Sequence, residues 1–309
     1  MAAVFLRREG FFVGDGKAKS LLQVLSAKEH HWVGNGFYVS TIFSVFDVDY
    51  KMITPFVLMD HADTKHFPPT TEKLGVGEHP HRGFETVTFA IQGEVEHRDS
   101  GGGGGVITTG GVQWMTAASG VVHDEFHSRE FAQTGGDFSM VQLWVNLPAK
   151  DKMTKPRYQS LDFKSFQQVE MAEGRAAASL IAGELAGHTG PAKTHTPMNI
   201  YRLKAIEDVE LPLDLHEGFT SLLFVLEGSM KIQDQTLKAR DLAAMSREGK
   251  ICQVKLSKGS EILVLNGEPI DEPIVHYGPF VMNTKAEIQQ AILDFQAGKM
   301  GSLVEESGS

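Results

Sequence analysis

An internal repeat is the feature that most narrows the folds open to this chain. Residues 83–93 read Gly-Phe-Glu-Thr-Val-Thr-Phe-Ala-Ile-Gln-Gly, and residues 218–228 read Gly-Phe-Thr-Ser-Leu-Leu-Phe-Val-Leu-Glu-Gly. Both segments place β-branched and aromatic residues between two glycines, which is the pattern of a strand bounded by turns. A repeat separated by this much sequence indicates two duplicated domains rather than a solenoid. The length of 309 residues suits two domains of ordinary size.

Short strands separated by glycine turns predict an all-β fold. Strands are expected at residues 84–91, 94–97, 106–107 and 112–115, with a five-glycine turn at residues 101–105. A chain of many short strands and glycine turns is typical of a β-sandwich or β-barrel. The glycine turn has two interpretations, a mobile lid over a pocket or a flexible surface turn, because glycine permits both.

Two pairs of metal-capable side chains flank these strands. His79 and His81 form one pair, and His123 and Glu125 form the other, each at i and i+2 spacing. Side chains at this spacing point to the same face of a strand, so the two pairs can converge if their strands are neighbours. Three imidazoles and one carboxylate suit a borderline divalent ion such as iron(II). The alternative is that these are structural histidines, since chance gives roughly 0.5 His-x-His pairs in a chain like this.

Several segments together resemble the pirin family of the cupin superfamily. They are residues 79–87, 112–117, 142–147 and 278–284, together with the His123-x-Glu125 pair. The resemblance implies two tandem cupin domains, which are jelly-roll β-barrels. It also implies a single iron, Fe(II), per chain, held by the matching residues His79, His81, His123 and Glu125. Several members of the family are flavonol (quercetin) dioxygenases, and some eukaryotic members act as transcription cofactors.

The repeat also predicts that the second domain binds no metal. In a sequence alignment of the two copies, the four ligand positions are occupied by Asp214, His216, Gln253 and Lys255. A lysine ammonium has no lone pair to offer a metal and adds a repelling charge. We therefore expect residues 1–150 to form an N-terminal metal-binding cupin and residues 151–309 a C-terminal cupin without metal. Residues 148–161 read as the linker between them.

The C-terminal domain is expected to end in a helix and a disordered tail. Thr284 and Glu287 form a capping-box pattern. The apolar residues that follow recur at helical spacing and predict a face that docks on a sheet: Ile288, Ala291, Ile292 and Phe295. Residues 300–309 are expected to be the disordered tail.

Composition limits the partners and the compartment. The net charge of −10 disfavours direct nucleic-acid binding by long-range attraction. The single cysteine, Cys252, allows no internal disulfide and fits a reducing compartment. Residues 1–10 carry charged side chains where a signal peptide needs an apolar core, and no apolar run is long enough for a membrane span. We expect a monomer in the cytoplasm, with the nucleus open for a eukaryotic source.

The leading functional hypothesis is an iron-dependent oxygenase that uses dioxygen to cleave flavonols or related phenolics. Other divalent transition metals stay open as the cofactor. Glu125 is the candidate catalytic residue, with two interpretations: it is a ligand only, or it also relays the substrate proton. The alternative, from a different class, is a non-enzymatic regulator whose iron state alters a protein partner. An open apolar cavity beside the metal would favour the enzyme.

Four further residues near the motifs have open roles. Glu85 occupies the glutamate position of the general cupin motif but, following the pirin pattern, is expected outside the ligand set, where it could support the site through hydrogen bonds. His97 and His127 either line the pocket or are polar strand residues. His61 either faces the pocket or is a structural histidine.

Overall fold

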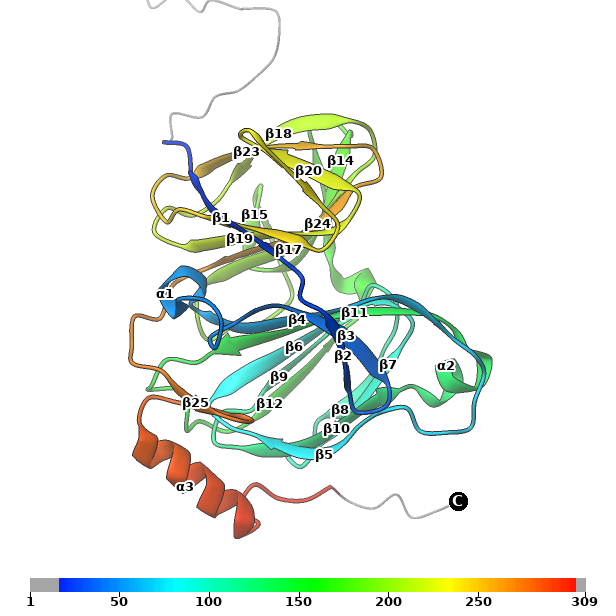
Figure 1. Cartoon of the computed structure of the whole chain (residues 1–309), viewed down its shortest axis with the longest axis vertical. Coiled ribbons are helices and arrows are strands. Elements are labelled where there is room, and N and C mark those ends of the chain that lie inside the picture. The colour runs from blue at the N-terminus through cyan, green and yellow to red at the C-terminus, as the bar shows by residue number, and fades with distance from the viewer. Residues whose placement is uncertain (1–16, 304–309) are drawn as a thin grey trace, which may run out of the picture.

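Two large antiparallel sheets lie face to face at the centre of the molecule, one from each of two stacked barrels (Figure 1). The computed structural model describes residues 17–303. The sheet of the first barrel has the order β12 (Arg157–Leu161), β9 (Val112–Thr116), β6 (Phe84–Gln92), β11 (Gly136–Asn146), β4 (Phe56–Phe67), β3 (Phe37–Ser44) and β2 (His30–Val33). That of the second barrel has the order β1 (Leu21–Ser26), β22 (Asp241–Met245), β19 (Thr220–Glu227), β24 (Glu261–Gly267), β17 (Met198–Ala205), β14 (Ala176–Ala182) and β13 (Gln167–Met171).

A smaller sheet completes each barrel on the side away from the centre. In the first barrel its order is β5 (Gly75–His81), β10 (Val121–His127), β7 (Val95–Asp99) and β8 (Gly104–Ile107). In the second barrel it is β18 (Val209–Asp214), β23 (Ile251–Leu256), β20 (Ser229–Ile232) and β21 (Gln235–Lys238). Two short hairpins remain, β15 (Glu184–Leu185) with β16 (His188–Thr189), and β25 (Val275–Tyr277) with β26 (Phe280–Met282).

The two barrels have the same strand order, position by position. The repeated segments form β6 and β19, and each lies third in its seven-stranded sheet. Each is flanked by an equivalent pair, β9 and β11 in one barrel and β22 and β24 in the other. The predicted all-β fold with two tandem cupin domains and a short C-terminal helix is therefore confirmed.

The central strands are buried on both faces, which explains their near-continuous apolar sequences. Val87 and Phe89 of β6 pack against Leu222 and Phe224 of β19 in one hydrophobic core between the two seven-stranded sheets. Thr88 lies between Val87 and Phe89 in sequence and faces the interior of the first barrel, because successive side chains of a strand point to opposite faces of the sheet. The site described below lies in that interior.

Each barrel contains one edge strand that the predicted division at residue 150 assigns to the other barrel. The N-terminal strand β1 pairs with β22 of the second barrel, and β12, from the predicted linker, pairs with β9 of the first. The C-terminal helix packs below the first barrel (Figure 1), where Arg82 binds Asp294 at 2.9 Å. The division into residues 1–150 and 151–309 stays a prediction, and the sheets exchange strands across it.

The helices are few and short. They are α1 (Tyr50–Ile53), α2 (Arg129–Thr134), α3 (Lys285–Gln296) and the 3₁₀ turn η1 (Phe163–Ser165). The predicted capping box of α3 is present, with the Glu287 backbone N–H donating to Thr284 Oγ1 at 3.2 Å. Within residues 17–303, no helix is long and apolar enough to cross a membrane.

Two details at the C-terminus differ from the sequence prediction. Phe295 is 39% exposed and Asp294 lies in the buried position instead, because Arg82 and Lys299 both pair with its carboxylate. Met300, predicted to lie in a disordered tail, is buried, and its carbonyl accepts a hydrogen bond from Ser100 Oγ at 2.6 Å. The rest of that predicted tail, from residue 304, and the predicted absence of a signal peptide at residues 1–10 lie outside the described residues.

Candidate metal centre

Strands β5 and β10 are neighbours, so the two ligand pairs predicted from sequence meet inside the first barrel. His79 lies directly opposite His123, at a ring-centroid distance of 4.2 Å. His81 lies 4.8 Å from His123 by the same measure. The ligand atoms of His79, His81 and His123 lie within 4.8 Å of one another, and those of His123, His97 and Glu125 form a second group within the same limit. All four predicted ligands therefore share one region, centred on His123.

A bulge in β5 lies opposite the segment of β10 that carries His123 and Glu125, since β5 advances three residues there while β10 advances two. His123 is opposite His79, but Glu125 is opposite Val76, so the register shifts between the two. A bulge bends a strand locally and can redirect a side chain. β10 itself pairs with β7 without a shift, so His123 and Glu125 stay two residues apart on one face of the strand, and both side chains are buried inside the barrel.

Hydrogen bonds at the outer ring nitrogens leave the inner nitrogens of the histidines free. His79 Nδ1 lies 2.8 Å from the Gly77 carbonyl oxygen, and His81 Nδ1 lies 3.3 Å from that of Pro279. A carbonyl oxygen only accepts, so each Nδ1 carries the proton and each Nε2 keeps its lone pair. Burial, followed by the neighbouring imidazoles, lowers the pKa of His81 and of His123 well below the ordinary value. Neutral imidazoles with free Nε2 atoms are the form that binds a metal.

His123 is held by a chain of two further residues. Its Nδ1 lies 3.3 Å from His97 Nδ1, and His97 Nε2 lies 3.2 Å from Asp99 Oδ2. Because Asp99 accepts a hydrogen bond from His97 Nε2, His97 Nδ1 is the acceptor for His123 Nδ1. His123 Nε2 is then left buried, with no hydrogen-bond partner in the part of the chain that the structure describes. A buried polar atom without a partner costs stability. The unpaired Nε2 of His123 lies beside two other free imidazole nitrogens, and this arrangement is expected if a metal is its partner.

The five-glycine segment is an ordered turn that holds Asp99. The backbone N–H groups of Gly101 and Gly103 donate to Asp99 Oδ1 at 2.8 and 3.0 Å. A Cβ at Gly103 would lie 2.4 Å from Asp99 Oδ2, so this position needs glycine. Although burial opposes it, hydrogen bonds from His97 and Gly103 lower the pKa of Asp99. The turn therefore keeps a charged carboxylate behind His97.

Glu125 is held by one of its two carboxylate oxygens. Its Oε1 accepts a hydrogen bond from Gln113 Nε2 and lies 3.2 Å from Thr88 Oγ1, whose single hydroxyl hydrogen is shared with Gln142 Oε1 at 2.6 Å. Tyr158 supports Gln113 with a 3.4 Å contact between its hydroxyl and Gln113 Oε1. The fixed Oε1 leaves Oε2 as the oxygen that can serve as a ligand or accept a proton. The donor set of three imidazole nitrogens and one carboxylate oxygen thus fits a divalent transition metal.

Asp99→Asn is expected to weaken metal binding by about 10- to 100-fold, which is the usual effect of changing a residue that orients a ligand. The amide cannot accept from His97 with the strength of a carboxylate, so the ring of His123 loses its fixed orientation. Equilibrium titration with a competing chelator measures the affinity. Asp124→Asn is the matched control, since Asp124 lies between two ligands on β10 but pairs outward with Arg98. Equal affinities of the two variants would contradict this role for Asp99.

A pocket of about 340 Å³ opens beside the candidate ligands His79, His81 and Glu125. Its remaining walls are largely apolar and come from Val33, Phe37, Val39, Val76, Met140, Trp144, Gly278 and Pro279. Two polar side chains from the barrel interior, Asp60 and Gln142, also line it. A largely apolar cavity with a few polar groups and a reactive centre at one end is typical of a small-molecule site.

The other residues that sequence marked for a role lie outside this pocket. His61 packs edge-on against Phe224 of the second barrel, and His127 lies among aromatic rings with its Nε2 3.0 Å from the Gly36 carbonyl. Burial lowers the pKa of His127 to about 4, so it is a neutral structural histidine. Glu85 shares a strand face with Val87 and points toward the second barrel, where it accepts a 2.6 Å hydrogen bond from Thr116. It makes no contact with the ligands.

Glu85 is expected to make stability fall as pH rises. Burial raises its pKa to about 7, against 4.5 for an ordinary glutamate. The folded state therefore holds this proton more tightly than the unfolded state, so the stabilisation is complete below pH 4.5 and is lost as pH rises through 7. Between pH 5 and pH 8 the wild type should lose roughly 2–3 kcal/mol more stability than Glu85→Gln.

Urea unfolding at both pH values measures this difference. Glu184→Gln, at an exposed position, is the matched control and should follow the wild type. Parallel pH profiles of Glu85→Gln and the wild type would show that Glu85 is ionised in the folded protein.

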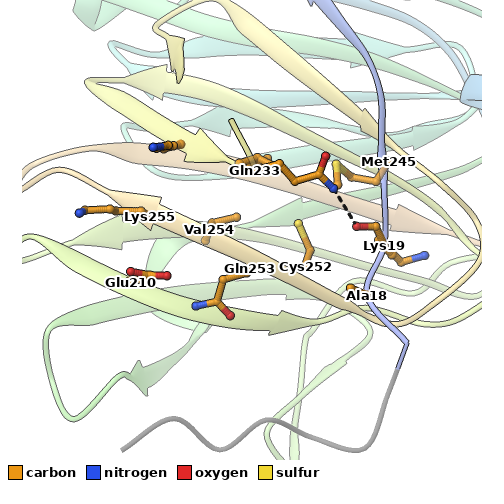
Figure 2. Close-up of a pocket in the computed structure, with 11 residues that line it drawn as sticks. Ala18, Lys19, Glu210, Gln233, Met245, Cys252, Gln253, Val254 and Lys255 are labelled. Carbon is orange, nitrogen blue, oxygen red and sulfur yellow. Dashed lines mark hydrogen bonds between the residues drawn. The ribbon is translucent and has the colours of Figure 1, made fainter. Parts of the chain in front are cut away.

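The second barrel carries different residues at the ligand positions than the sequence alignment indicated. Cys252 is equivalent to His123, because it lies opposite Leu213 as His123 lies opposite His79. Val254 is equivalent to Glu125, because it lies opposite Ile232 as Glu125 lies opposite His97. Gln253 and Lys255 are exposed, and Figure 2 shows the side chains of Gln253 and Cys252 leaving β23 in opposite directions. The alignment was wrong by one residue here, because a shift of one residue turns every side chain to the other face of a strand.

With the corrected positions we still predict that the second cupin binds no metal, but for a different reason. A hollow of about 360 Å³ next to β23 has the buried residues Ile232, Cys252 and Val254 in its lining. Lys19, whose carbonyl accepts a hydrogen bond from Gln233, also lines it (Figure 2). Burial raises the pKa of the Cys252 thiol to about 12, so the thiol keeps its proton. Leucine, isoleucine and valine offer no ligand atoms, and a protonated thiol is a poor one.

Sequence reasoning named His97 only as a residue that could line the pocket, and it missed Asp99, Gln113 and Thr88. His97 and Asp99 form a third pair at i and i+2 spacing, in the strand beside β10, and that spacing was a usable signal. Gln113 and Thr88 gave no such signal, because their contact with Glu125 depends on which strands pair.

The chain matches two family models, one described as Pirin over residues 39–145 and one described as the Pirin C-terminal cupin domain over residues 200–301. It is 45% identical over 281 residues to a Pseudomonas aeruginosa protein that carries the provisional name quercetin 2,3-dioxygenase, with 91% of this chain and 98% of that protein covered. It is 37% identical to a pirin-like protein of Solanum lycopersicum, with 81% and 82% covered.

Solved structures give the same relationship. The fold is similar to that of a quercetin 2,3-dioxygenase from Acinetobacter baumannii, with a TM-score of 0.89, 48% identity, and coverage of 93% of this chain and 100% of that one. A bacterial pirin from Escherichia coli, solved in complex with nickel(II), shares the fold with a TM-score of 0.61 at 20% identity, covering 80% and 99% of the two chains.

Proposed function

This chain belongs to the pirin family, and on that premise we propose that it is a metal-dependent dioxygenase that cleaves flavonols such as quercetin. The observation that carries the proposal is the convergence of three free imidazole nitrogens and one carboxylate at the end of a largely apolar pocket. The names of the relatives in Pseudomonas aeruginosa and Acinetobacter baumannii supply the substrate class. The reaction takes up dioxygen and opens the central ring of the flavonol.

Iron(II) is the proposed metal, one per chain, held by His79, His81, His123 and Glu125. When bound, it would supply a Lewis-acidic and redox-active centre with net charge of about +1, since three ligands are neutral and one is an anion. That charge favours an anionic oxygen donor such as a flavonolate. The nickel(II) complex of the Escherichia coli pirin makes nickel the alternative metal to test.

The chain's own residues bind the substrate and handle its proton. The apolar walls around Phe37, Met140 and Trp144 accept a flat aromatic molecule and exclude water. Glu125 Oε1 is immobilised by Gln113 and Thr88, so Oε2 is the atom placed to accept the proton of the flavonol hydroxyl. The fixed His97 and Asp99 keep His123 in one orientation during the reaction.

The pocket favours an enzyme over a non-enzymatic regulator with a protein partner. A regulator needs only a metal and an outer surface, whereas this site has a cavity of about 340 Å³ beside the ligands. A cytoplasmic location and a monomeric state remain proposals from composition.

Anaerobic purification, loading with iron(II) or nickel(II), and oxygen-uptake measurements on a panel of phenolics test the function. The proposal expects uptake with flavonols that hold the 3-hydroxy-4-keto group and none with flavones that lack the 3-hydroxyl. Uptake with neither class, at full metal loading, would favour the regulator.

A further inference from the structure

A row of polar side chains crosses the floor of the first barrel on adjacent strands. Each member lies directly opposite the next across the sheet, and the row runs through Thr41, Asp60, Gln142, Thr88 and Gln113. Hydrogen bonds connect most of it: Thr41 Oγ1 to Asp60 Oδ1 at 2.7 Å, Thr88 Oγ1 to Gln142 Oε1 at 2.6 Å, and Gln113 Nε2 to Thr88 Oγ1 at 3.1 Å. We call these residues the polar row.

The fold itself does not require the polar row, and the second barrel shows this. Following the same strand pairings there, the equivalent residues are Leu180, Tyr201, Val264, Leu223 and Ala243. All five belong to the hydrophobic core of that barrel. A duplicated barrel thus packs the same positions with apolar side chains and one tyrosine, so the polar row serves the site rather than the packing.

The two ends of the polar row have different surroundings. At one end, Thr88 and Gln113 fix Glu125, which accounts for their polarity. At the other end, Asp60 lines the pocket, although it makes no contact with a candidate ligand. Its only hydrogen bond within the described part of the chain is the one from Thr41, which engages Oδ1 and leaves Oδ2 available.

A carboxyl group at this position is costly. Burial raises the pKa of Asp60, because the ionised form is poorly solvated in this environment. The pocket walls near it include Val33, Val39 and Met140, which offer no polar atoms from their side chains. Asp60 is half-buried, and a carboxyl oxygen in largely apolar surroundings is stabilised by a hydrogen-bond partner, which a hydroxyl of a bound molecule would supply.

We propose that Asp60 is a specificity-determining residue, which binds a hydroxyl on the part of the flavonol remote from its metal-binding 3-hydroxy-4-keto group. The proposal rests on the proposed function, since it takes the flavonol site as given. It narrows the substrate class to flavonols with additional ring hydroxyls, such as quercetin, over the bare parent 3-hydroxyflavone. The apolar walls hold the rings of both, and Asp60 distinguishes them.

Binding measured without turnover tests this assignment. Metal-loaded protein under argon is titrated with quercetin and with 3-hydroxyflavone, and the ratio of the two dissociation constants is compared between variants. The wild type should favour quercetin by about tenfold or more, the usual worth of one buried hydrogen bond. Asp60→Leu should reduce the ratio at least fivefold by weakening quercetin alone. Asp60→Asn, which keeps polar atoms and a partner for Thr41, should retain part of the preference.

Two controls keep the outcomes distinct. Metal content and circular dichroism establish that each variant is folded and loaded, and if Asp60→Leu does not fold, Asp60→Asn carries the test with an expected loss of about threefold. A ratio unchanged in the folded variants, or a wild type with no preference, overturns the role of Asp60. If the ratio depends on Asp60 but no flavonol is consumed in air, the dioxygenase proposal fails and the binding role of Asp60 stands.

Discussion

His123→Ala is expected to abolish stoichiometric metal binding while the barrel stays folded. His123 is the only residue shared by both groups of convergent ligand atoms found among the described residues. Its loss should weaken binding by more than the 10- to 100-fold that follows a change in a supporting residue. Folding should survive, because the substitution removes one long hydrogen bond, from Nδ1 to His97, and the removed Nε2 has no hydrogen-bond partner among residues 17–303. Elemental analysis after loading and desalting measures the metal per chain, and we expect a value near zero.

The second barrel supplies the matched control for this substitution. Cys252 occupies the position equivalent to His123, so Cys252→Ala removes a side chain from the same place in the second barrel, where the neighbouring equivalent positions are held by Leu213, Ile232 and Val254. This variant should keep about one metal per chain, as the wild type does. A stoichiometry near one in His123→Ala would mean that the metal lies elsewhere, and a loss of metal in Cys252→Ala would place a metal in the second barrel.

Glu125→Gln is expected to lower turnover far more than flavonol binding. Gln113 Nε2 donates to Oε1, so a glutamine at this position would place its carbonyl oxygen there and its NH₂ group where Oε2 was. An NH₂ group can neither ligate a metal nor accept a proton. The loss of a positioned general base costs about 10²- to 10⁴-fold in rate, whereas the apolar walls that bind the flavonol rings are unchanged.

Comparison of kcat with the anaerobic dissociation constant separates these effects. We expect kcat to fall by about 100-fold or more and the dissociation constant for quercetin to change by less than about tenfold. Because the substitution also removes an anionic ligand, both values are taken at saturating metal. A dissociation constant that rises as steeply as kcat falls would assign Glu125 to substrate binding alone.

Much of the fold, and the convergence of the candidate ligands, was predictable because the signals are local. The i and i+2 spacing of His79 with His81, and of His123 with Glu125, depends only on strand geometry. The glycine-bounded repeat appears directly in the sequence, and the structure places both copies at the same position of their sheets.

The features that sequence reasoning missed depend on how distant strands pair. The loops before β23 and β10 differ in length, so the alignment placed Lys255 on the wrong face of its strand. The edge strand β1 joins a sheet whose other strands are remote from it in sequence, and β12 pairs with β9 rather than with β11, the strand that precedes it; no local pattern records either choice. The same is true of Asp60 and Gln142, which become neighbours only through the pairing of β4 with β11.

The most direct test of the central claim is the loss of the quercetin absorbance band with iron-loaded protein, measured in air and under argon. A metal-dependent dioxygenase in the first barrel predicts that the wild type bleaches quercetin in air, with one dioxygen consumed per flavonol, and does not bleach it under argon. It predicts that His123→Ala bleaches it in neither atmosphere and that Cys252→Ala matches the wild type. Equal bleaching in air by the wild type and His123→Ala would contradict the account.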